Sequence, residues 1–384
     1  MILTQNEALT DERRDFVAAI EDFCRREAGT REQWLKLTDG GAEPHNAELY
    51  GKMAELGWLG VSVPEQYGGA GQGMVDLLLF LETTAYWQVP IGGFATSAIT
   101  AASYEKFGGE EQKSRVLGDF LRGGVLAVSM SEPGAGSDVA ALTCKAERRD
   151  GGWVVNGQKT WCSNAHIAEH ILLVARTSAA GDRHDGLTMF SVPAGVEGLE
   201  IHGIETMGGK EVNDLYFTDC FLPDDAVVGQ VDHAWRQLMA GLNLERMILA
   251  GLMLGTARRA FDDTVSYARE RTQFGRPVGS FQALRHRLAD HATELECTRL
   301  LVHDVARRID ADPARMLPRE ASMAKLKATE VAKAMALDGM QMMGGYGYAT
   351  EYGMERLLRS TVVSTVYGGT SEIQRDIIGK TYGL

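Results

Sequence analysis

The order of hydrophobic periodicities constrains this chain more than any other feature. Apolar residues recur at helical spacing through about the first 120 residues, as at Phe16, Ile20 and Phe23. From Gly123 to about residue 230 the apolar pattern is short and alternating, and long helical stretches return from Trp235 onward. An amphipathic helix repeats every 3.6 residues and a half-buried strand every two. The chain therefore reads as helical, then β, then helical.

This pattern predicts three domains, with bounds 1–122, 123–233 and 234–384. Turn residues such as Asp150-Gly151 and Asn156-Gly157 lie between the alternating segments of the middle part, which indicates antiparallel hairpins. The expected helices span 46–56, 74–88, 92–107, 235–269, 280–311, 318–343, 353–362 and 370–380. The expected strands span 125–130, 143–148, 153–156, 171–176, 187–192 and 215–222, and residues 60–64 read as a short extended piece. Long amphipathic helices with short connections favour an antiparallel bundle.

Charge and cysteine usage exclude several classes of function. The formal net charge is −13, which argues against general binding to nucleic acid or to anionic membranes. The five cysteines are widely spaced and form no C-x-x-C motif, so we expect a reducing compartment, no disulfide framework and no metal site. The N-terminus lacks the pattern of a signal peptide, and no apolar run approaches the ~18 residues that a membrane span requires. We therefore expect a cytoplasmic protein.

Glycine is abundant, with 44 residues, and it is clustered. Such clusters mark tight turns or places where the backbone closely approaches a ligand. One cluster lies in Ser131–Asp138, directly after an expected strand. A dinucleotide-binding loop would have to run into a helix with a third small residue, but Val139 stands there. A plain β-loop and a loop that offers hydroxyl and N–H groups to an extended ligand both remain open.

Four further motifs have a structural interpretation, and the first two also have a functional one. Trp161, beside Ser163, is typical either of a β-domain core or of a wall against an aromatic ring. Arg271 ends a long helix, where it can stabilise the helix dipole or bind a diphosphate. Gly344-Gly345 is a normal helix C-cap. Near the C-terminus, Thr370 or Ser371 is expected to cap the final helix, with Gln374 near its N3 position.

Together, and in this order, the motifs resemble those of the acyl-CoA dehydrogenases, a family of FAD-dependent flavoproteins. The resemblance covers essentially the whole chain and is strongest at Ser131–Asp138, Asn156–Asn164, Arg269–Gly275, Gln341–Gly347 and Thr370–Arg375. It implies an α+β multidomain fold: an N-terminal helical domain, a middle antiparallel β-barrel-like domain and a C-terminal four-helix bundle. It also implies a homotetramer, a dimer of dimers, that passes electrons to an electron-transfer flavoprotein in lipid catabolism such as β-oxidation.

The resemblance also implies a cofactor site for FAD. Met130 and Ser131 would meet the flavin ring, Trp161 and Ser163 would hold its other side, and Ser137 would lie near the CoA and flavin phosphates. The residues expected to reach the FAD of a neighbouring subunit are Arg271, Gln282, Gln341, Gly344 and Gly345. At the adenine and diphosphate end we expect Thr370 and Glu372.

The family's reaction needs a carboxylate that removes the α-proton of the acyl thioester while the β-hydride leaves for the flavin. Many members carry that base within a Tyr-Glu-Gly-Thr motif, but this sequence reads Tyr367-Gly368-Gly369-Thr370. Gly368 retains only the backbone N–H, which can act as an oxyanion donor.

Isovaleryl-CoA-type branches place the base on the first long helix of the C-terminal bundle, where Glu245 stands here. Glu245 precedes a buried apolar run, so it must be paired or functional; its structural alternative is a partner for an arginine. We expect Glu245 to be the base, with Asn243 and Arg246 contacting substrate.

Other functions on the same fold remain open at this point. A flavin-dependent enoyl-CoA reductase shares the displaced base, and the sequence cannot set the direction of a reversible redox step. A flavin monooxygenase needs no carboxylate base. An FAD-binding subunit of a hetero-oligomeric dehydrogenase would supply only part of a composite site.

Overall fold

The computed structural model of the protein describes residues 9–179 and 183–384, which form two compact units. The first unit contains the chain up to Lys36, Gly73–Val89 and Asn243–Leu384. The second unit contains Leu37–Gln72 and Pro90–Leu242. Each unit draws on segments that are far apart in the sequence.

The part of the chain before the sheet is helical, as expected. Its helices are α1 (Asp11–Ala28), α2 (Arg31–Leu37), α3 (Ala47–Glu55), α4 (Met74–Tyr86), α5 (Gly93–Phe107) and α6 (Glu110–Leu121). α1 begins where the Thr10 hydroxyl accepts a hydrogen bond from the Arg13 N–H at 3.3 Å, a typical N-cap. The extended piece expected at 60–64 is wrong: Trp58–Gly60 form a 3-10 helix and residues 61–63 continue as a turn and a bend.

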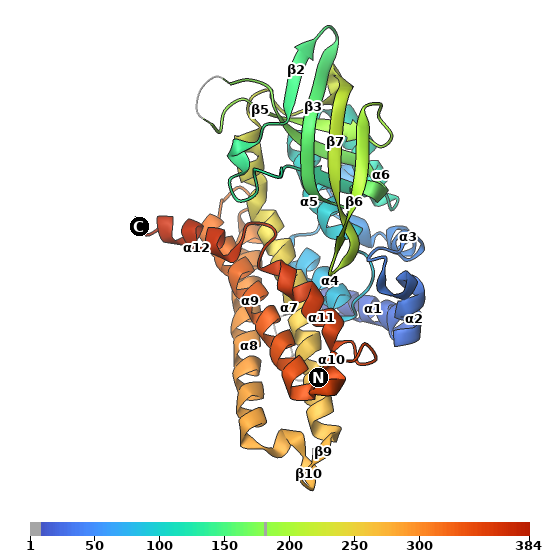
Figure 1. The fold of residues 1–384 in the computed structure, drawn as a ribbon, viewed down its shortest axis with the longest axis vertical. Coiled ribbons are helices and arrows are strands. Elements are labelled where there is room, and N and C mark those ends of the chain that lie inside the picture. The colour runs from blue at the N-terminus through green and yellow to red at the C-terminus, as the bar shows by residue number, and fades with distance from the viewer. Residues whose placement is uncertain (1–8, 180–182) are drawn as a thin grey trace. The chain divides into compact units, whose positions relative to one another are not determined.

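The second unit is built on a mixed sheet (Figure 1). Its strands are β1 (Val125–Ser129), β2 (Lys145–Arg149), β3 (Gly152–Ser163), β4 (Ala168–Arg176), β5 (Leu187–Pro193), β6 (Leu199–Thr206), β7 (Gly209–Pro223) and β8 (Val227–Val228). The strand order is β6-β7-β3-β2-β4-β5-β8, and β1 pairs with β4. The sheet is therefore open, not a closed barrel. It is also not antiparallel throughout, because β1 and β2 both run parallel to β4.

One glycine of this sheet has a different role from the one expected. Asn156-Gly157 is not a hairpin turn but a β-bulge inside β3, at a register shift against β7. Gly157 has φ +145°, and a Cβ there would lie 2.8 Å from the Cys144 Cα. The hairpin between β2 and β3 turns instead at Asp150-Gly151. Because β3 continues through the bulge, it carries Trp161 and Ser163 at its end.

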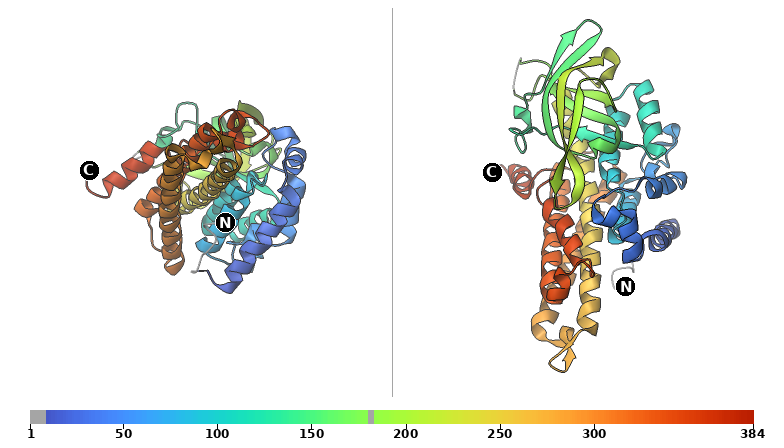
Figure 2. Two further views of the ribbon diagram at one scale, coloured as in Figure 1. Left: turned by 90° about the horizontal axis from the view of Figure 1, so that it is seen from below. Right: turned by 45° about the vertical axis from the view of Figure 1, so that its right-hand side comes forward.

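The first unit is helical. Its C-terminal segment contributes α7 (Ala234–Glu270, of which Asn243–Glu270 belong to this unit), α8 (Gln282–Ala311), α9 (Pro318–Met343), α10 (Gly345–Tyr348), α11 (Met354–Ser364) and α12 (Ser371–Lys380). A short hairpin of β9 (Thr272–Gln273) and β10 (Arg276–Pro277) follows α7. Helices α8 and α9 lie side by side, and α9 also packs against α11 and α12 (Figure 2). None of the described helices combines the length and hydrophobicity of a membrane crossing.

Close backbone contact holds α7 to α4 in this unit. A Cβ at Gly255 would lie 2.2 Å from the Glu82 carbonyl oxygen, so only glycine permits this helix spacing. The start of α4 is fixed from α8, because the Asp310 carboxylate accepts a hydrogen bond from the Val75 N–H at 3.1 Å. These contacts give α7 a rigid neighbour and so fix the direction in which its side chains project.

Candidate active site

Glu245 lies on α7, half-buried, between two buried polar residues. Asn243 is 9% exposed and Arg246 is 5% exposed. The apolar run that follows Glu245, residues 247–250, is buried as expected. Within the described part of the chain, the Glu245 carboxylate makes no hydrogen bond and no ion pair, including none to Arg246. The structural alternative, a salt bridge to an arginine, is therefore absent from this structure.

Gly368 lies in the loop between α11 and α12, and this loop reaches Glu245. A Cβ built on Gly368 would lie 3.4 Å from the Glu245 Oε1 atom and 2.3 Å from the Leu249 Cδ1 atom. The backbone there has φ +59°, the left-handed region that favours glycine. Leu249 thus occupies the volume that a side chain at 368 would need, and the Glu245 carboxylate lies beside the same position.

Two buried side chains hold the carbonyl groups of this loop. The Lys325 Nζ atom, fully buried on α9, donates hydrogen bonds of 2.9 Å each to the carbonyl oxygens of Ser364, Tyr367 and Gly369. The Gln374 amide donates to the carbonyls of Gly368 and Gly369, at 3.0 and 3.1 Å. These bonds turn the carbonyl groups of residues 367–369 inward.

Burial disfavours the charged forms of the two ionisable groups beside this loop, and their mutual attraction opposes that effect. Burial raises the pKa of the Glu245 carboxyl above its ordinary value, and the positive charges of Arg246 and Lys325 oppose that rise. Burial lowers the pKa of the Lys325 ammonium to about 8, although Glu245 favours its charged form. A carboxylate with a raised pKa and no hydrogen-bond partner among the described residues is a good general base.

Asn243 and Arg246 present buried polar groups next to Glu245. The Asn243 amide makes only a long contact, 3.9 Å from its Nδ2 atom to the Met316 sulfur, and its Oδ1 atom has no partner among the described residues. Buried polar atoms are nearly always hydrogen-bonded. An unsatisfied buried amide oxygen is therefore an acceptor that a ligand can use.

In the second unit, the loop after β1 is held by a buried ion pair. The Lys159 Nζ atom donates to the Met130 carbonyl at 2.9 Å and to the Glu132 carboxylate at 2.8 Å. Glu132 also accepts hydrogen bonds from the backbone N–H groups of Thr143 and Cys144. Although burial alone would raise the pKa of Glu132, Lys159 and these N–H groups hold it below its ordinary value. The sequence analysis missed this pair, which fixes the predicted flavin-facing residues.

The end of β3 lies next to the same loop. The Thr160 N–H donates to the Ser131 carbonyl at 2.9 Å, which joins the loop to β3. Trp161 has φ +59° and is 60% exposed, so the core interpretation of this tryptophan is wrong. Ser163 is half-buried, and Ser137 is exposed in the loop. A Cβ at Gly134 or Gly136 would meet no atom within 4 Å, so the loop backbone is open.

The remaining predicted cofactor residues lie in the first unit, at helix ends. Gln282 begins α8 and Gln341 lies in the last turn of α9, and both are exposed. Gly344 and Gly345 follow, with open space around both. The Arg271 guanidinium lies 5.5 Å from the centre of the Tyr346 ring and has no acidic partner among the described residues. These groups are free to meet a ligand.

Thr370 caps α12 as expected, because its hydroxyl accepts a hydrogen bond from the Ile373 N–H at 3.3 Å. Gln374 takes no part in a capping box; its side chain reaches back to the Gly368 loop. Glu372 is exposed in the first turn of α12. Its own N–H and the Thr370 hydroxyl lower its carboxyl pKa.

The structure thus brings Glu245 and Gly368 together. It also shows Lys325, which the sequence analysis missed, and gives Gln374 a role in holding the loop instead of the expected place in a helix cap. Lys325 carried a signal: it shares a helical stripe with the buried Ala321, Ala328 and Ala332. The predicted residues of the β-part, from Met130 to Ser163, lie in the second unit and all others in the first.

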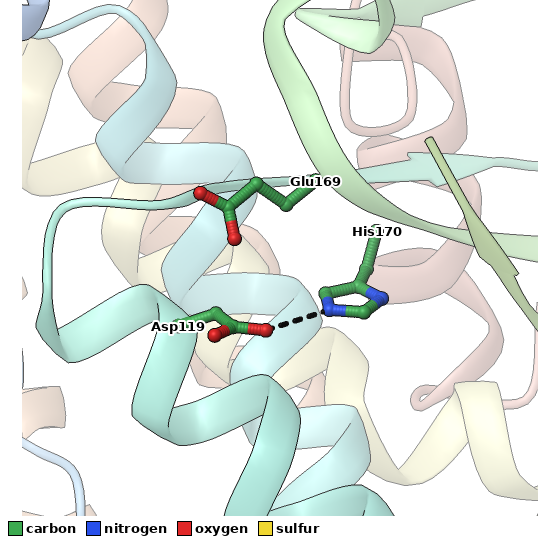
Figure 3. Close-up of side chains that lie close together, drawn as sticks. All are labelled: Asp119, Glu169 and His170. Atoms are coloured by element: carbon green, nitrogen blue, oxygen red, sulfur yellow. Dashed lines mark hydrogen bonds and ion pairs between the residues drawn. The ribbon is translucent and has the colours of Figure 1, made fainter. Parts of the chain in front are cut away.

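A separate group of polar residues is the cluster of Asp119, Glu169 and His170 in the second unit (Figure 3). The His170 Nε2 atom lies 2.9 Å from the Asp119 Oδ2 atom, and Glu169 is exposed. The Asp119 carbonyl also accepts a hydrogen bond from the Gly124 N–H at 2.8 Å. The cluster joins the end of α6 to β4, and we assign no metal to it.

Comparison with known proteins identifies relatives over the whole chain. Residues 10–124, 127–220 and 232–383 match the N-terminal, middle and C-terminal domains of acyl-CoA dehydrogenase. The mitochondrial isovaleryl-CoA dehydrogenase of Arabidopsis thaliana is 34% identical over 377 residues, which cover 96% of this chain and 91% of the relative. The benzylmalonyl-CoA dehydrogenase of Aromatoleum aromaticum is 36% identical over 381 residues, covering 97% and 98%.

A solved structure shows the same fold. The acyl-CoA dehydrogenase from Geobacillus kaustophilus superimposes with a TM-score of 0.92 at 31% identity, and the match covers 98% of this chain and 99% of that one.

Proposed function

This chain belongs to the acyl-CoA dehydrogenase family, and we propose that Glu245 is the base with which it performs the family's reaction. The protein is an FAD-dependent oxidoreductase that dehydrogenates an acyl-CoA thioester to the trans-2-enoyl-CoA. One observation carries the assignment of the base. The unpartnered Glu245 carboxylate lies 3.4 Å from the point at which a side chain on Gly368 would begin.

The reaction requires a base and an oxyanion site close together. The α-proton of a thioester is weakly acidic, so the developing negative charge on the carbonyl oxygen must be stabilised by preorganised donors. Glu245 takes the α-proton in our proposal. The Gly368 N–H, which makes no hydrogen bond to any other described residue, is the donor that the chain itself offers. FAD, when bound, supplies the acceptor for the β-hydride.

The residues around the predicted cofactor positions fit FAD. Trp161 offers an exposed aromatic face, and aromatic rings pack favourably against one another. Arg271 offers a guanidinium without an acidic partner, which suits a diphosphate. Open backbone at Gly134, Gly136, Gly344 and Gly345 permits close approach of a large ligand. We propose Met130, Ser131, Ser163, Gln282, Gln341, Thr370 and Glu372 as further contacts.

We propose Asn243, Arg246 and Ser137 as substrate contacts. Asn243 has the orphaned amide oxygen described above, and Arg246 is a buried cation beside Glu245. Ser137 lies in the exposed loop where phosphates of CoA can be reached. The relatives are named for isovaleryl-CoA and benzylmalonyl-CoA. The panel of substrates to be tested therefore includes branched and aryl thioesters as well as straight chains.

The proposal also covers the assembly of the protein, its electron acceptor and its place in the cell. Phe274 and Tyr348 of the first unit are 94% and 79% exposed, which supports a partner subunit covering these faces. We propose a homotetramer, in which Arg271 and the Gln341–Gly345 segment serve the cofactor of a neighbouring subunit. We further propose that an electron-transfer flavoprotein accepts the electrons, and that the enzyme works in the cytoplasm in lipid catabolism.

Anaerobic titration with acyl-CoA thioesters tests the proposal. The purified holoenzyme is mixed with straight, branched and aryl thioesters, the flavin spectrum is followed, and the product is analysed by mass spectrometry. We expect bleaching of the flavin and loss of two hydrogens from one class of thioester, without added reductant. If no thioester bleaches the flavin, but an external reductant does and the reduced flavin then reacts with oxygen, the result would instead indicate the monooxygenase. Absence of FAD from the chain purified alone would indicate a subunit of a hetero-oligomer.

A further inference from the structure

Lys325 is a fully buried lysine whose bonds are concentrated on one loop. Its three hydrogen bonds go to the carbonyl oxygens of Ser364, Tyr367 and Gly369, each at 2.9 Å. Burying a lysine is costly unless its donors are satisfied. Here all of its donors serve the end of α11 and the loop that carries Gly368.

The bond to Tyr367 sets the direction of the Gly368 N–H. The carbonyl of Tyr367 and the N–H of Gly368 belong to the same trans peptide unit and point in opposite directions. Because the carbonyl points at Lys325 of α9, the N–H points away from α9. Gln374 binds the next two carbonyls, of Gly368 and Gly369, and therefore does not orient this N–H directly.

A charged donor on the carbonyl also makes the N–H of the same peptide a stronger hydrogen-bond donor. An ionised donor binding to a peptide carbonyl polarises the unit, and hydrogen bonds in a chain strengthen one another. The N–H of Gly368 becomes a better donor to an oxyanion when a cation holds the opposite end of its peptide. The same ammonium acts on Glu245, since its positive charge favours the ionised carboxylate.

We propose that Lys325 is a positioning residue for the dehydrogenation: it aims and polarises the Gly368 N–H as the oxyanion donor and supports the charge of Glu245. This inference rests on the proposed function. The alternative is that Lys325 only satisfies carbonyls at the end of α11, as basic side chains often do at helix ends. That role would affect folding but not the ionisation of Glu245.

Removal of the α-proton can be measured without any hydride transfer. A 3-thia-acyl-CoA carries sulfur in place of the β-carbon, so it keeps its α-protons but has no β-hydrogen to give. Its chain is chosen to match the thioester that reduces the flavin fastest. In D2O the holoenzyme exchanges the α-protons for deuterium, and NMR follows the rate.

The comparison uses Lys325→Met and two further variants. Lys327→Met is the matched control: it removes a partly exposed lysine of the same helix that pairs with Glu294. Gln374→Leu removes the other side chain that holds the loop. We expect Lys325→Met to slow exchange by ~10²–10³-fold, as loss of one oxyanion donor does. We expect Gln374→Leu to cost less than about tenfold, and Lys327→Met less than about twofold.

The pH profile separates positioning from a merely structural role. The charged groups that act on Lys325 are Glu245 and Arg246 of α7, Glu330 of α9 and Glu372 of α12. Glu245 responds to Arg246 and Lys325. Removing the Lys325 charge therefore raises the pKa of Glu245 further. In a plot of exchange rate against pH, the acid limb then moves to higher pH. In Lys327→Met the limb stays at its wild-type position.

Each outcome decides between the interpretations. The inference is overturned if Lys325→Met binds FAD and exchanges the α-protons at the wild-type rate. It is also overturned if Lys325→Met exchanges them only as slowly as Gln374→Leu does and the acid limb of its pH profile has not moved. Should Lys325→Met fail to fold, Lys325→Gln is measured instead, and the same loss and shift are expected. Glu245→Gln distinguishes the two proposals: if it exchanges normally, the proposed base is wrong, whereas if it is inactive and Lys325→Met is normal, only the present inference fails.

Discussion

Gly368→Ala is the substitution that tests the packing of the site most sharply. At φ +59° an L-residue costs roughly 1–2 kcal/mol, of which ~0.4–1 kcal/mol is offset because alanine restricts the unfolded chain. The new Cβ would also lie 2.3 Å from the Leu249 Cδ1 atom. Overpacking of this kind costs typically ~1–3 kcal/mol. The variant should therefore lose about 1–4.5 kcal/mol of unfolding free energy.

Gly57→Ala is the matched control for the cost of placing an L-residue in the left-handed backbone conformation. Gly57 has φ +76° and ψ +4°, and a Cβ there meets no atom within 4 Å. Its loss should be about 0.5–1.5 kcal/mol, since only the left-handed conformation is penalised. Urea denaturation of the holoenzymes, followed by circular dichroism, measures both losses.

A double-mutant cycle with Leu249→Ala isolates the clash. In the Leu249→Ala background, Gly368→Ala should cost only as much as Gly57→Ala does, which gives a coupling energy of at least about 1 kcal/mol. A coupling near zero, or a Gly368→Ala loss equal to that of Gly57→Ala, would refute the packing of Leu249 against this loop.

Three other expectations follow from the site. Lys159→Met leaves Glu132 buried without its cation, so it should lower the unfolding free energy by ~3–5 kcal/mol in urea and reduce FAD content, and adding Glu132→Gln should restore part of the loss. Arg271→Ala should raise the Kd for FAD at least about tenfold in apoenzyme titrations with an unchanged circular dichroism spectrum, whereas the exposed Arg269→Ala should not. Because the pKa of Glu245 is raised and only the ionised form accepts a proton, the acid limb of kcat/KM should lie above the ~4.3 of an ordinary glutamate in a pH profile of flavin bleaching.

Where the periodicity is strong, the sequence predicts structure closely. α9 has the bounds 318–343 that its apolar stripe predicts, and α4 and α5 begin within one residue of expectation. Strand β6 was missed because it is an edge strand of half-buried and exposed residues, so its alternation carries little hydrophobic signal. The bulge at Gly157 was mistaken for a turn because both conformations select Asn-Gly.

Some residues of the site could likewise be predicted from the sequence, and others could not. The resemblance to the acyl-CoA dehydrogenases, read together with Gly368 and the acid before a buried run, indicated Glu245, and the structure brings the two positions together. Lys325 was not predicted: its place among the buried alanines of α9 indicated burial, but not which groups its ammonium would bind. Which carbonyls it binds depends on the loop between α11 and α12, whose glycines give no periodicity. Contacts of this kind follow from tertiary packing rather than from local pattern.

The rate of flavin bleaching in Glu245→Gln tests the account most directly. The variant and the wild type are mixed anaerobically with the preferred acyl-CoA in a stopped-flow instrument, after FAD content and acyl-CoA binding have been shown to be equal. Glutamine preserves the size of the side chain but cannot take the α-proton. We predict that the variant binds FAD and loses at least ~10³-fold in the bleaching rate. Bleaching within about tenfold of wild type would contradict Glu245 as the base.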